Sequence, residues 1–172
     1  MTDSPANILC KSCGLCCSGH LFAWTNLTAA EFGAAQSLGF TIIQDNPSQR
    51  GFTQPCPMWN GVCKIYSSPD YPRSCKTYKC NIFRRLLDED ISLPDALAMI
   101  QETLNLIGEI EPLLLVSSVP SFRERLITYK EELESKKREH TALEQEFLHK
   151  AQALLTYYED RFGMDDFIDY EI

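Results

Sequence analysis

Cysteine is the residue type whose number and spacing predict chemistry most directly in this sequence. The chain has 172 residues and eight cysteines, all before residue 81: Cys10, Cys13, Cys16, Cys17, Cys56, Cys63, Cys75 and Cys80. Thiolates are soft ligands that bind zinc and the iron of iron-sulfur clusters. Because a two-residue gap lets a tight turn direct two sulfurs at one metal ion, the opening C-x2-C-x2-C-C predicts a metal site. We expect at least six of these eight cysteines to ligate metal.

The spacing fits both zinc and iron. Cys10, Cys13 and Cys16 also match the opening run with which ferredoxins hold a [4Fe-4S] cluster, whose fourth ligand is remote. The adjacent Cys16 and Cys17 point to opposite faces in a strand and diverge by about 100° in a helix, so they are not equivalent ligands of one mononuclear site. Eight thiols then form two four-sulfur sites or one larger polynuclear site. We place Cys10, Cys13 and Cys16 on one centre and Cys17 on another.

Disulfides are the main alternative use of these thiols. Residues 1–12 lack the basic start and apolar stretch of a secretory signal, and the longest aliphatic run, Leu113–Val116, is far short of the ~20 residues of a membrane span. We therefore expect a cytoplasmic protein without a membrane segment, in a compartment where disulfides are rare. A metal ion bound to these cysteines would either hold an irregular segment together or take part in redox or catalytic chemistry, and the sequence favours neither role.

Charge is divided at the same place as cysteine. The formal net charge is −8, with +2 in residues 1–80 and −10 in residues 81–172. Overall negative charge disfavours nonspecific binding to nucleic acid or anionic lipid. A basic run remains, and we interpret it as compensation for thiolate charge, with docking of an acidic peptide, RNA or a phosphate as the alternative: Arg73, Lys76, Lys79, Arg84 and Arg85.

Other candidates are weaker. His20 follows the first cluster and is an alternative metal ligand, although a lone histidine is more often satisfied locally. Trp59, Tyr66 and Tyr78 are interpreted as walls that shield a metal site from water, rather than as stacking platforms. The acidic run 88–90 is expected to be the solvated end of a helix that starts near Asn81. No phosphate loop, nucleophile elbow or zinc-protease helix motif is present, so hydrolase and kinase functions have no support.

The elements around the cysteines are predicted to be short. Thr28 and Glu31 form a capping box that predicts a helix over residues 29–38, ended by Gly39 and packed over the cysteine site. Five prolines between residues 46 and 80 predict that no long regular element follows. Something other than secondary structure must therefore hold that segment.

The second half is predicted to be helical. An apolar stripe predicts a helix over residues 93–107 that closes at Gly108 and Pro112, and residues 113–116 form a short strand or a connector. The members of this stripe are Leu93, Leu97, Ile100, Leu104 and Ile107. Ser121 begins a stretch to residue 162 without Gly or Pro, which predicts one very long helix or a helical hairpin packed on the 93–107 helix. A single straight helix would be longer than a small domain is wide, so we expect a bend near residues 135–138 or a projecting helix paired with a partner. Two stripes carry this expectation: Phe122, Leu126, Tyr129 and Leu133, then Leu143, Phe147, Ala151, Leu154 and Tyr158. Some apolar surface would remain there for a protein partner or a second copy.

We therefore expect a mainly α fold in one domain of residues 1–172. An irregular cysteine-cluster metal-binding region, about residues 8–80, packs on a helical region of residues 81–172.

Four segments together resemble a known family. They are Cys10-x2-Cys13-Gly-x-Cys16-Cys17, Leu27-Thr28-x2-Glu31, Cys56-Pro57-x5-Cys63-x-Ile65-Tyr66 and Pro72-x2-Cys75-x2-Tyr78-x-Cys80. The pattern is similar to the zinc- or iron-chelating CxxCxxCC domain of the YkgJ-like cysteine cluster proteins, over about residues 10–80. Two departures are Tyr71 in place of the family's Arg before Pro72, and a longer gap between Cys63 and Cys75.

The resemblance implies metal chelation by all eight cysteines, with zinc or iron, including an iron-sulfur cluster, as the cofactor. Related clusters occur in flagellin lysine N-methylases. The sequence thus predicts a metal-binding protein, with a metal- or iron-sulfur-dependent enzyme that carries out a redox reaction or modifies a protein or small molecule as the alternative.

Overall fold

The computed structural model describes residues 4–43, 45, 50–114 and 121–164, and in them the apolar stripe of the second half forms the central helix α5 (Leu93–Ile110). Ser92 caps its first turn, since its Oγ accepts the Asp95 N–H and the Asp95 carboxylate accepts the Ser92 N–H. The predicted end at Gly108 is wrong. The helix continues because Gly108 is exposed, where Gly costs only ~1 kcal/mol, and because Ile110 beyond it is fully buried. Pro112 then lies in the 3-10 turn η2 (Glu111–Leu113).

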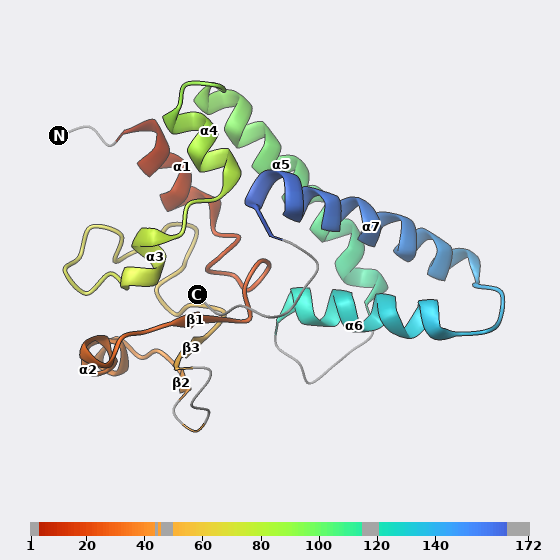
Figure 1. Cartoon of the computed structure of the whole chain (residues 1–172), viewed down its shortest axis with the longest axis horizontal. Helices are drawn as coiled ribbons and strands as arrows, with labels where there is room; N and C mark the ends of the chain where they lie inside the picture. Colours follow the sequence, from red (N-terminus) through yellow and green to blue (C-terminus); the bar gives the residue numbers. More distant parts are fainter. Residues whose placement is uncertain (1–3, 44, 46–49, 115–120, 165–172) are drawn as a thin grey trace.

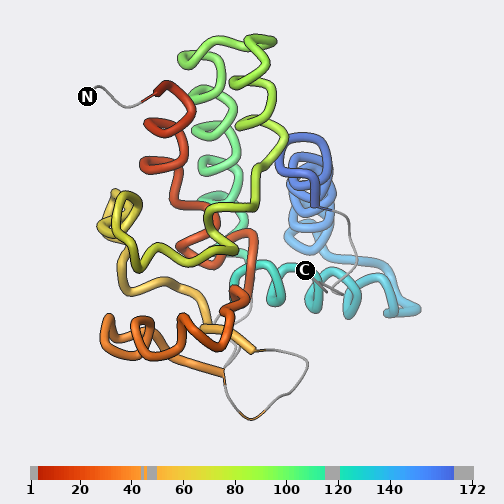
Figure 2. Tube along the Cα trace, turned by 60° about the vertical axis from the view of Figure 1, so that its left-hand side comes forward, coloured from red at the N-terminus to blue at the C-terminus, as the bar shows by residue number. Residues whose placement is uncertain are grey.

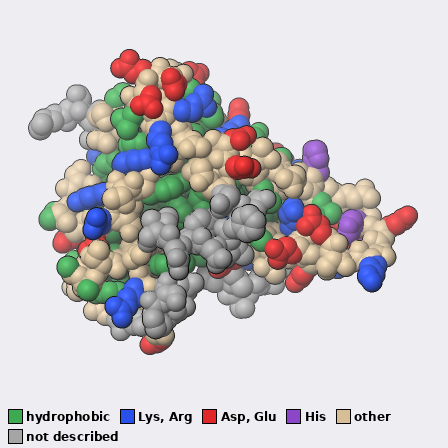
Figure 3. All heavy atoms as spheres, viewed as in Figure 1, with side chains coloured by type: hydrophobic (Ala, Val, Ile, Leu, Met, Phe, Trp, Pro, Cys, Tyr) green, Lys and Arg blue, Asp and Glu red, His purple; other side chains and the backbone are tan. Residues whose placement is uncertain are grey.

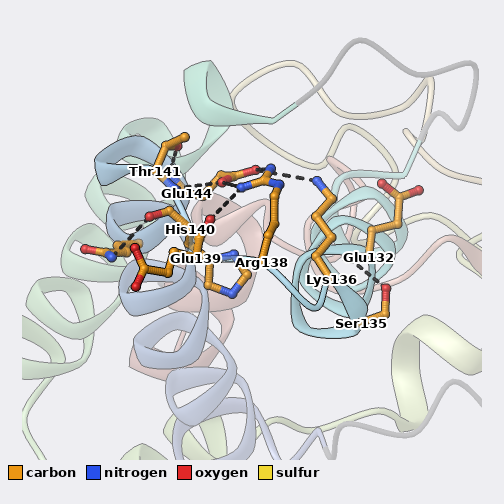
Figure 4. Close-up of polar contacts among 9 residues, drawn as sticks. Glu132, Ser135, Lys136, Arg138, Glu139, His140, Thr141 and Glu144 are labelled. Carbon is orange, nitrogen blue, oxygen red and sulfur yellow. Dashed lines mark hydrogen bonds and ion pairs between the residues drawn. The ribbon is translucent and has the colours of Figure 1, made fainter.

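The breaker-free stretch forms two helices, α6 (Phe122–Ser135) and α7 (Ala142–Phe162). The predicted bend near residues 135–138 is confirmed. Figure 4 shows Arg138 in the connection reaching Glu144, and its Nη2 lies 2.6 Å from Glu144 Oε1. Glu144 also accepts the N–H of Thr141, whose own hydroxyl accepts the Glu144 N–H. This second capping box, absent from the sequence predictions, is what restarts the helix.

Helix α7 packs on α5 as predicted (Figure 1), whereas α6 packs mainly on α7. Four members of the α7 stripe are at most 1% exposed: Phe147, Ala151, Leu154 and Tyr158. Leu143 is 65% exposed, so its assignment to the buried stripe was wrong. Leu97, predicted on the α5 stripe, is also exposed. Because Leu154 and Tyr158 are intramolecular core, they offer no surface to a second copy.

The N-terminal region joins this core through α1 (Pro5–Cys13), which lies beside α4 (Asn81–Leu87) and α5 (Figures 1 and 2). Ala6, Leu9, Leu15 and Leu21 are buried in one cluster with residues of the C-terminal helices. Seven α-helices lie among the described residues, so the predicted mainly α class is confirmed.

A second, smaller cluster lies around a three-stranded antiparallel sheet. The strand order is β1-β3-β2, with β1 (Trp24–Asn26), β3 (Gly51–Thr53) and β2 (Ile42–Ile43). The predicted helix over 29–38 appears as a 3-10 turn η1 (Ala29–Glu31) followed by α2 (Phe32–Ser37), with its capping box and a left-handed Gly39 at φ 82°. Cys56, Cys63 and Cys75 pack against this cluster, to which Ala35 of α2 also belongs, and the predicted placement of this helix over the cysteine site stays a prediction.

The proline-rich segment contains only short elements, β3 and α3 (Arg73–Thr77), within its described part. Leu115 and Val116, for which a strand or a connector was predicted, lie outside the described residues. Among the described helices, none combines the length and apolar character needed to cross a bilayer.

Candidate metal centre

The eight cysteines are brought together from five segments of the chain. Cys10 and Cys13 lie three residues apart on α1, and therefore on one helix face. Gly14 ends α1 in the left-handed conformation at φ 71°, and the chain turns so that Cys16 and Cys17 follow at once. Gly is needed there, because a Cβ would collide with the ring of Trp59. Cys56 and Cys63 lie in the loop after β3, Cys75 lies on α3, and Cys80 is the N-cap residue of α4.

Most of these side chains face one cavity of about 460 Å3 between the sheet, α1 and the start of α6. Seven cysteines line it, and Cys80, which does not, is close enough to Cys13 and Cys16 to raise the pKa of both thiols. All eight thiols are free and half-buried, so none is used in a disulfide.

The adjacent thiols of Cys16 and Cys17 have largely different electrostatic neighbours. The Cys16 thiol is affected by Cys13, Cys17, Cys80 and Cys10. The Cys17 thiol is affected by Cys56, Cys63, Cys75 and Cys10. The adjacent pair thus belongs mainly to different neighbourhoods, and Cys10 acts on both of them.

Backbone amides surround the sulfurs in a repeated pattern. The N–H of Phe83 donates to Cys80 Sγ over 3.4 Å, three residues after the cysteine. The same local arrangement, with amides two or three residues later, lowers the thiol pKa of Cys13, Cys56, Cys63 and Cys80 against the opposing effect of burial. Hydrogen bonds to a sulfur favour its thiolate form, the form that ligates metal. This is the local geometry expected of metal-ligating turns.

Burial is nevertheless the largest influence on every thiol. It raises the pKa of Cys13 to about 12, with the neighbouring Cys80 and Cys10 adding to the shift. Burial and the charges of Cys56, Cys63 and Cys10 likewise raise the pKa of Cys75 to about 12. Thiols with such pKa values are protonated at neutral pH unless a cation compensates the charge. A metal ion supplies that cation, because its charge reverses the local effect on the pKa.

The thiol groups are therefore chemically suited to a soft metal ion, but the sulfur atoms do not point at one common position. Within the described residues, no three His, Cys, Asp or Glu side chains form a group arranged to hold a metal ion. A cysteine sulfur moves by rotation about one side-chain bond, among three staggered positions. Ligation by these residues consequently requires rotation of side chains that already lie near one another.

The weaker candidates are accounted for elsewhere in the fold. His20 Nδ1 lies 2.6 Å from Ser18 Oγ, its ring packs edge-on against Phe122, and burial lowers its pKa. It is satisfied locally, as expected. The acidic run 88–90 is exposed at the end of α4, which begins at Asn81 as predicted.

The predicted aromatic residues surround the cysteines. The Tyr66 hydroxyl donates to Asn7 Oδ1 over 3.0 Å and also forms a hydrogen bond with Cys10 that lowers the thiol pKa. The Tyr78 hydroxyl donates to the carbonyl of Phe162 over 2.7 Å, which ties the last turn of α7 to the segment between Cys75 and Cys80. Trp59 packs on Gly14.

The basic run follows α3 and α4, where Lys and Arg side chains gather on the face in view in Figure 3. Lys79 lowers the pKa of the Cys10 thiol, and its ammonium lies 4.4 Å from the ring centre of Phe83. Arg84 lines the cavity, whereas Arg85 is not among its lining residues. Within the basic run, Lys79 is therefore a residue whose positive charge acts on a cysteine sulfur.

Two polar residues of the cavity wall were missed by the sequence analysis. Gln54 and Arg123 both line the cavity and are only 3% and 4% exposed. Gln54 directly precedes Pro55 and Cys56, and Arg123 sits two residues into α6. No spacing rule relates them to the cysteines, because only the tertiary fold brings α6 to the cavity.

Comparison of the chain with protein-family models, curated proteins and solved structures finds no match.

Proposed function

We propose that this protein binds metal through its eight cysteines, in two four-thiolate groups. The first group is Cys10, Cys13, Cys16 and Cys80, and the second is Cys17, Cys56, Cys63 and Cys75. The observation that carries the proposal is the gathering of eight free, half-buried thiols, with largely different electrostatic neighbours for Cys16 and Cys17 and with backbone amides directed at the sulfurs.

The alternative uses of these thiols are less favourable. A core needs no such concentration of thiols, and apolar side chains would fill the space at lower cost. Burial opposes thiolate formation at every one of these positions, yet the amides and Lys79 favour it. Groups that stabilise a thiolate in a buried setting serve ligation or reactivity rather than packing.

Zinc and iron, including iron-sulfur clusters, both suit all-thiolate groups. A closed four-thiolate zinc site is usually structural, whereas a cluster adds redox chemistry. The cavity beside the sulfurs favours a second candidate function, a metal-dependent enzyme, because seven cysteines line a space that a substrate would enter.

Anaerobic purification with elemental analysis and an absorption spectrum tests the proposal. Stoichiometric iron with labile sulfide and a brown colour identify a cluster, and about two zinc ions per colourless chain identify two mononuclear sites. Protein with less than about one metal ion per chain, and with all thiols free to react with a thiol reagent, contradicts it.

Single variants test the division into two groups. Ser is a preferred N-cap residue, so Cys80→Ser removes a sulfur and keeps the cap of α4. Cys80→Ser and Cys56→Ser should each lose about half of the metal, and the double variant nearly all of it. Ser12→Ala, at an exposed position between Cys10 and Cys13, is the control and should retain full metal. Complete loss in either single variant means one polynuclear site.

A further inference from the structure

We infer that the cavity beside the cysteines binds a small amphipathic anion that carries an N–H or O–H donor. The inference goes beyond metal binding, because it rests on the part of the cavity wall that contains no cysteine. Three features of that wall define the ligand: its apolar surface, a buried amide and an excess of cations.

The body of the ligand is set by the apolar wall. Phe22, Phe40, Phe52, Ile65 and Ile127 line the cavity together with Trp24 and Tyr78. A volume of about 460 Å3 lies within the range of small-molecule sites, which are mostly apolar with a few polar groups. The wall therefore favours an aromatic or branched aliphatic body.

The donor of the ligand is set by Gln54. Its Nε2 donates to Thr25 Oγ1 over 2.9 Å, whereas its Oε1 is buried without a hydrogen-bond partner among the described residues. A buried carbonyl oxygen that loses water and gains no donor is costly, so such atoms are usually paired. Gln54 is part of the cavity wall but its Oε1 is closed off from the cavity in this conformation, so a ligand N–H or O–H would pair with Oε1 once the side chain rotates toward the cavity.

The charge of the ligand is set by Arg84 and Arg123, because Lys79 already compensates the sulfur charge at Cys10. Lys79, Arg84 and Arg123 line the cavity, and Glu124 is the only carboxylate among the described lining residues. Lys79 lies near Cys10, at the cysteine end, whereas Arg123 lies on α6. The planar guanidinium of Arg123 suits the paired oxygens of a carboxylate, sulfonate or phosphate. A ligand that spans from Gln54 to Arg123 would present its anionic group at α6 and its body to the cysteines.

The probe that combines these features is an anilinonaphthalene sulfonate with its amine and sulfonate at opposite ends of the naphthalene. The corresponding N-phenylnaphthylamine lacks the sulfonate and reports the apolar wall alone. In the full chain we expect one equivalent of the sulfonate to bind, about tenfold or more tighter than the neutral analogue. Metal content is measured in each sample, so that failure of the metal proposal is seen separately.

Variants locate the site. Arg84→Gln should weaken the sulfonate severalfold and leave the neutral analogue unchanged, whereas Arg85→Gln, equally exposed on α4 but outside the cavity, should change neither. Arg123→Gln should weaken the sulfonate about tenfold, with Arg125→Gln on the same helix as its control. Gln54→Leu should weaken both probes, because it removes the acceptor of the amine.

Some results would overturn the inference. They are equal losses in the Arg84 and Arg85 variants, several weak equivalents in place of one, or unchanged affinity of both probes in Gln54→Leu. Because Arg84→Gln lies on an exposed surface, its result stands even if Arg123→Gln fails to fold.

Discussion

The cysteine region, residues 4–80, and the helical region, residues 81–164, reach order by different means. In the helical region, α5 and α7 span 18 and 21 residues, each begins with a capping box, and each buries a continuous apolar face. Among the described residues of the cysteine region, the longest helix is α1 with nine residues, and the strands have two or three residues each. Helix packing and capping therefore account for one region, whereas the other depends more on individual contacts around its thiols. The region with the shorter helices and strands thus holds all eight candidate metal-ligating cysteines.

Metal removal should separate the two regions most strongly. If the sulfurs hold metal, a chelator such as dipicolinate under reducing conditions should unfold the cysteine region, since thiolate zinc sites contribute ~10 kcal/mol or more to folding. Helices α5 and α7 should keep most of their amide protection. Hydrogen exchange followed by mass spectrometry measures this. Equal loss of protection in both regions would contradict the comparison.

The helical region should be most sensitive at its buried stripe. Leu154→Ala removes a fully buried side chain from α7 and should lower the free energy of unfolding by about 3 kcal/mol. Leu143→Ala on the same helix is the control and should stay within ~0.5 kcal/mol, because Leu143 is exposed. Urea denaturation monitored by circular dichroism gives both values. Similar losses in the two variants would mean that Leu143 is also core.

Glycine substitutions should have opposite signs in the two regions. Gly14→Ala places a Cβ against Trp59 at a left-handed position and should cost about 2 kcal/mol or more. Gly108→Ala lies in α5 with open space around it and should stabilise by ~0.5–1 kcal/mol. The midpoints of thermal unfolding report both changes. Stabilisation by Gly14→Ala would show that the turn after α1 is not constrained.

Acid should act on the helical region through Glu144. Hydrogen bonds from Arg138 and the Thr141 N–H hold the pKa of Glu144 well below its usual 4.5. A carboxyl with a lowered pKa stabilises the fold at pH above about 4.5 and loses that contribution as the pH falls toward its folded value. The difference in melting temperature between neutral pH and pH ~3 should therefore shrink in Glu144→Gln. Glu131→Gln, exposed on α6, is the control and should leave that difference nearly unchanged.

Local signals predicted the helices from α4 onward and the η1–α2 segment, whereas α1, α3 and the three strands were not predicted. The Thr28–Glu31 and Ser121 caps, the α7 stripe from Phe147 onward and the interruption after Ser135 each depend on residues within one or two turns of each other, and the structure agrees with them. The predictions were wrong at positions where burial in the tertiary structure, rather than a local sequence signal, determines the conformation or the exposure. Gly108 lies inside α5 because Ile110 is buried beyond it, and Leu143 faces solvent because the first turn of α7 extends past the core.

The site was predictable in residue type and in part of its arrangement. Adjacent side chains diverge, which led to the assignment of Cys16 and Cys17 to different centres, and their electrostatic neighbours differ accordingly. The cavity was not predictable, because Gln54 and Arg123 reach it from segments about seventy residues apart and no local pattern marks either. Metal occupancy itself stays a prediction.

Both tryptophans of the chain lie in the cysteine region, with Trp24 on the cavity wall and Trp59 against Gly14. Indole emission therefore reports the cysteine region, whereas far-ultraviolet ellipticity reports mainly the helical region. The unmodified chain thus provides a separate optical channel for each region, and the two melting curves can be recorded on one sample. Coincident curves would mean that the regions unfold as one cooperative unit, and separated curves would give the order in which they are lost.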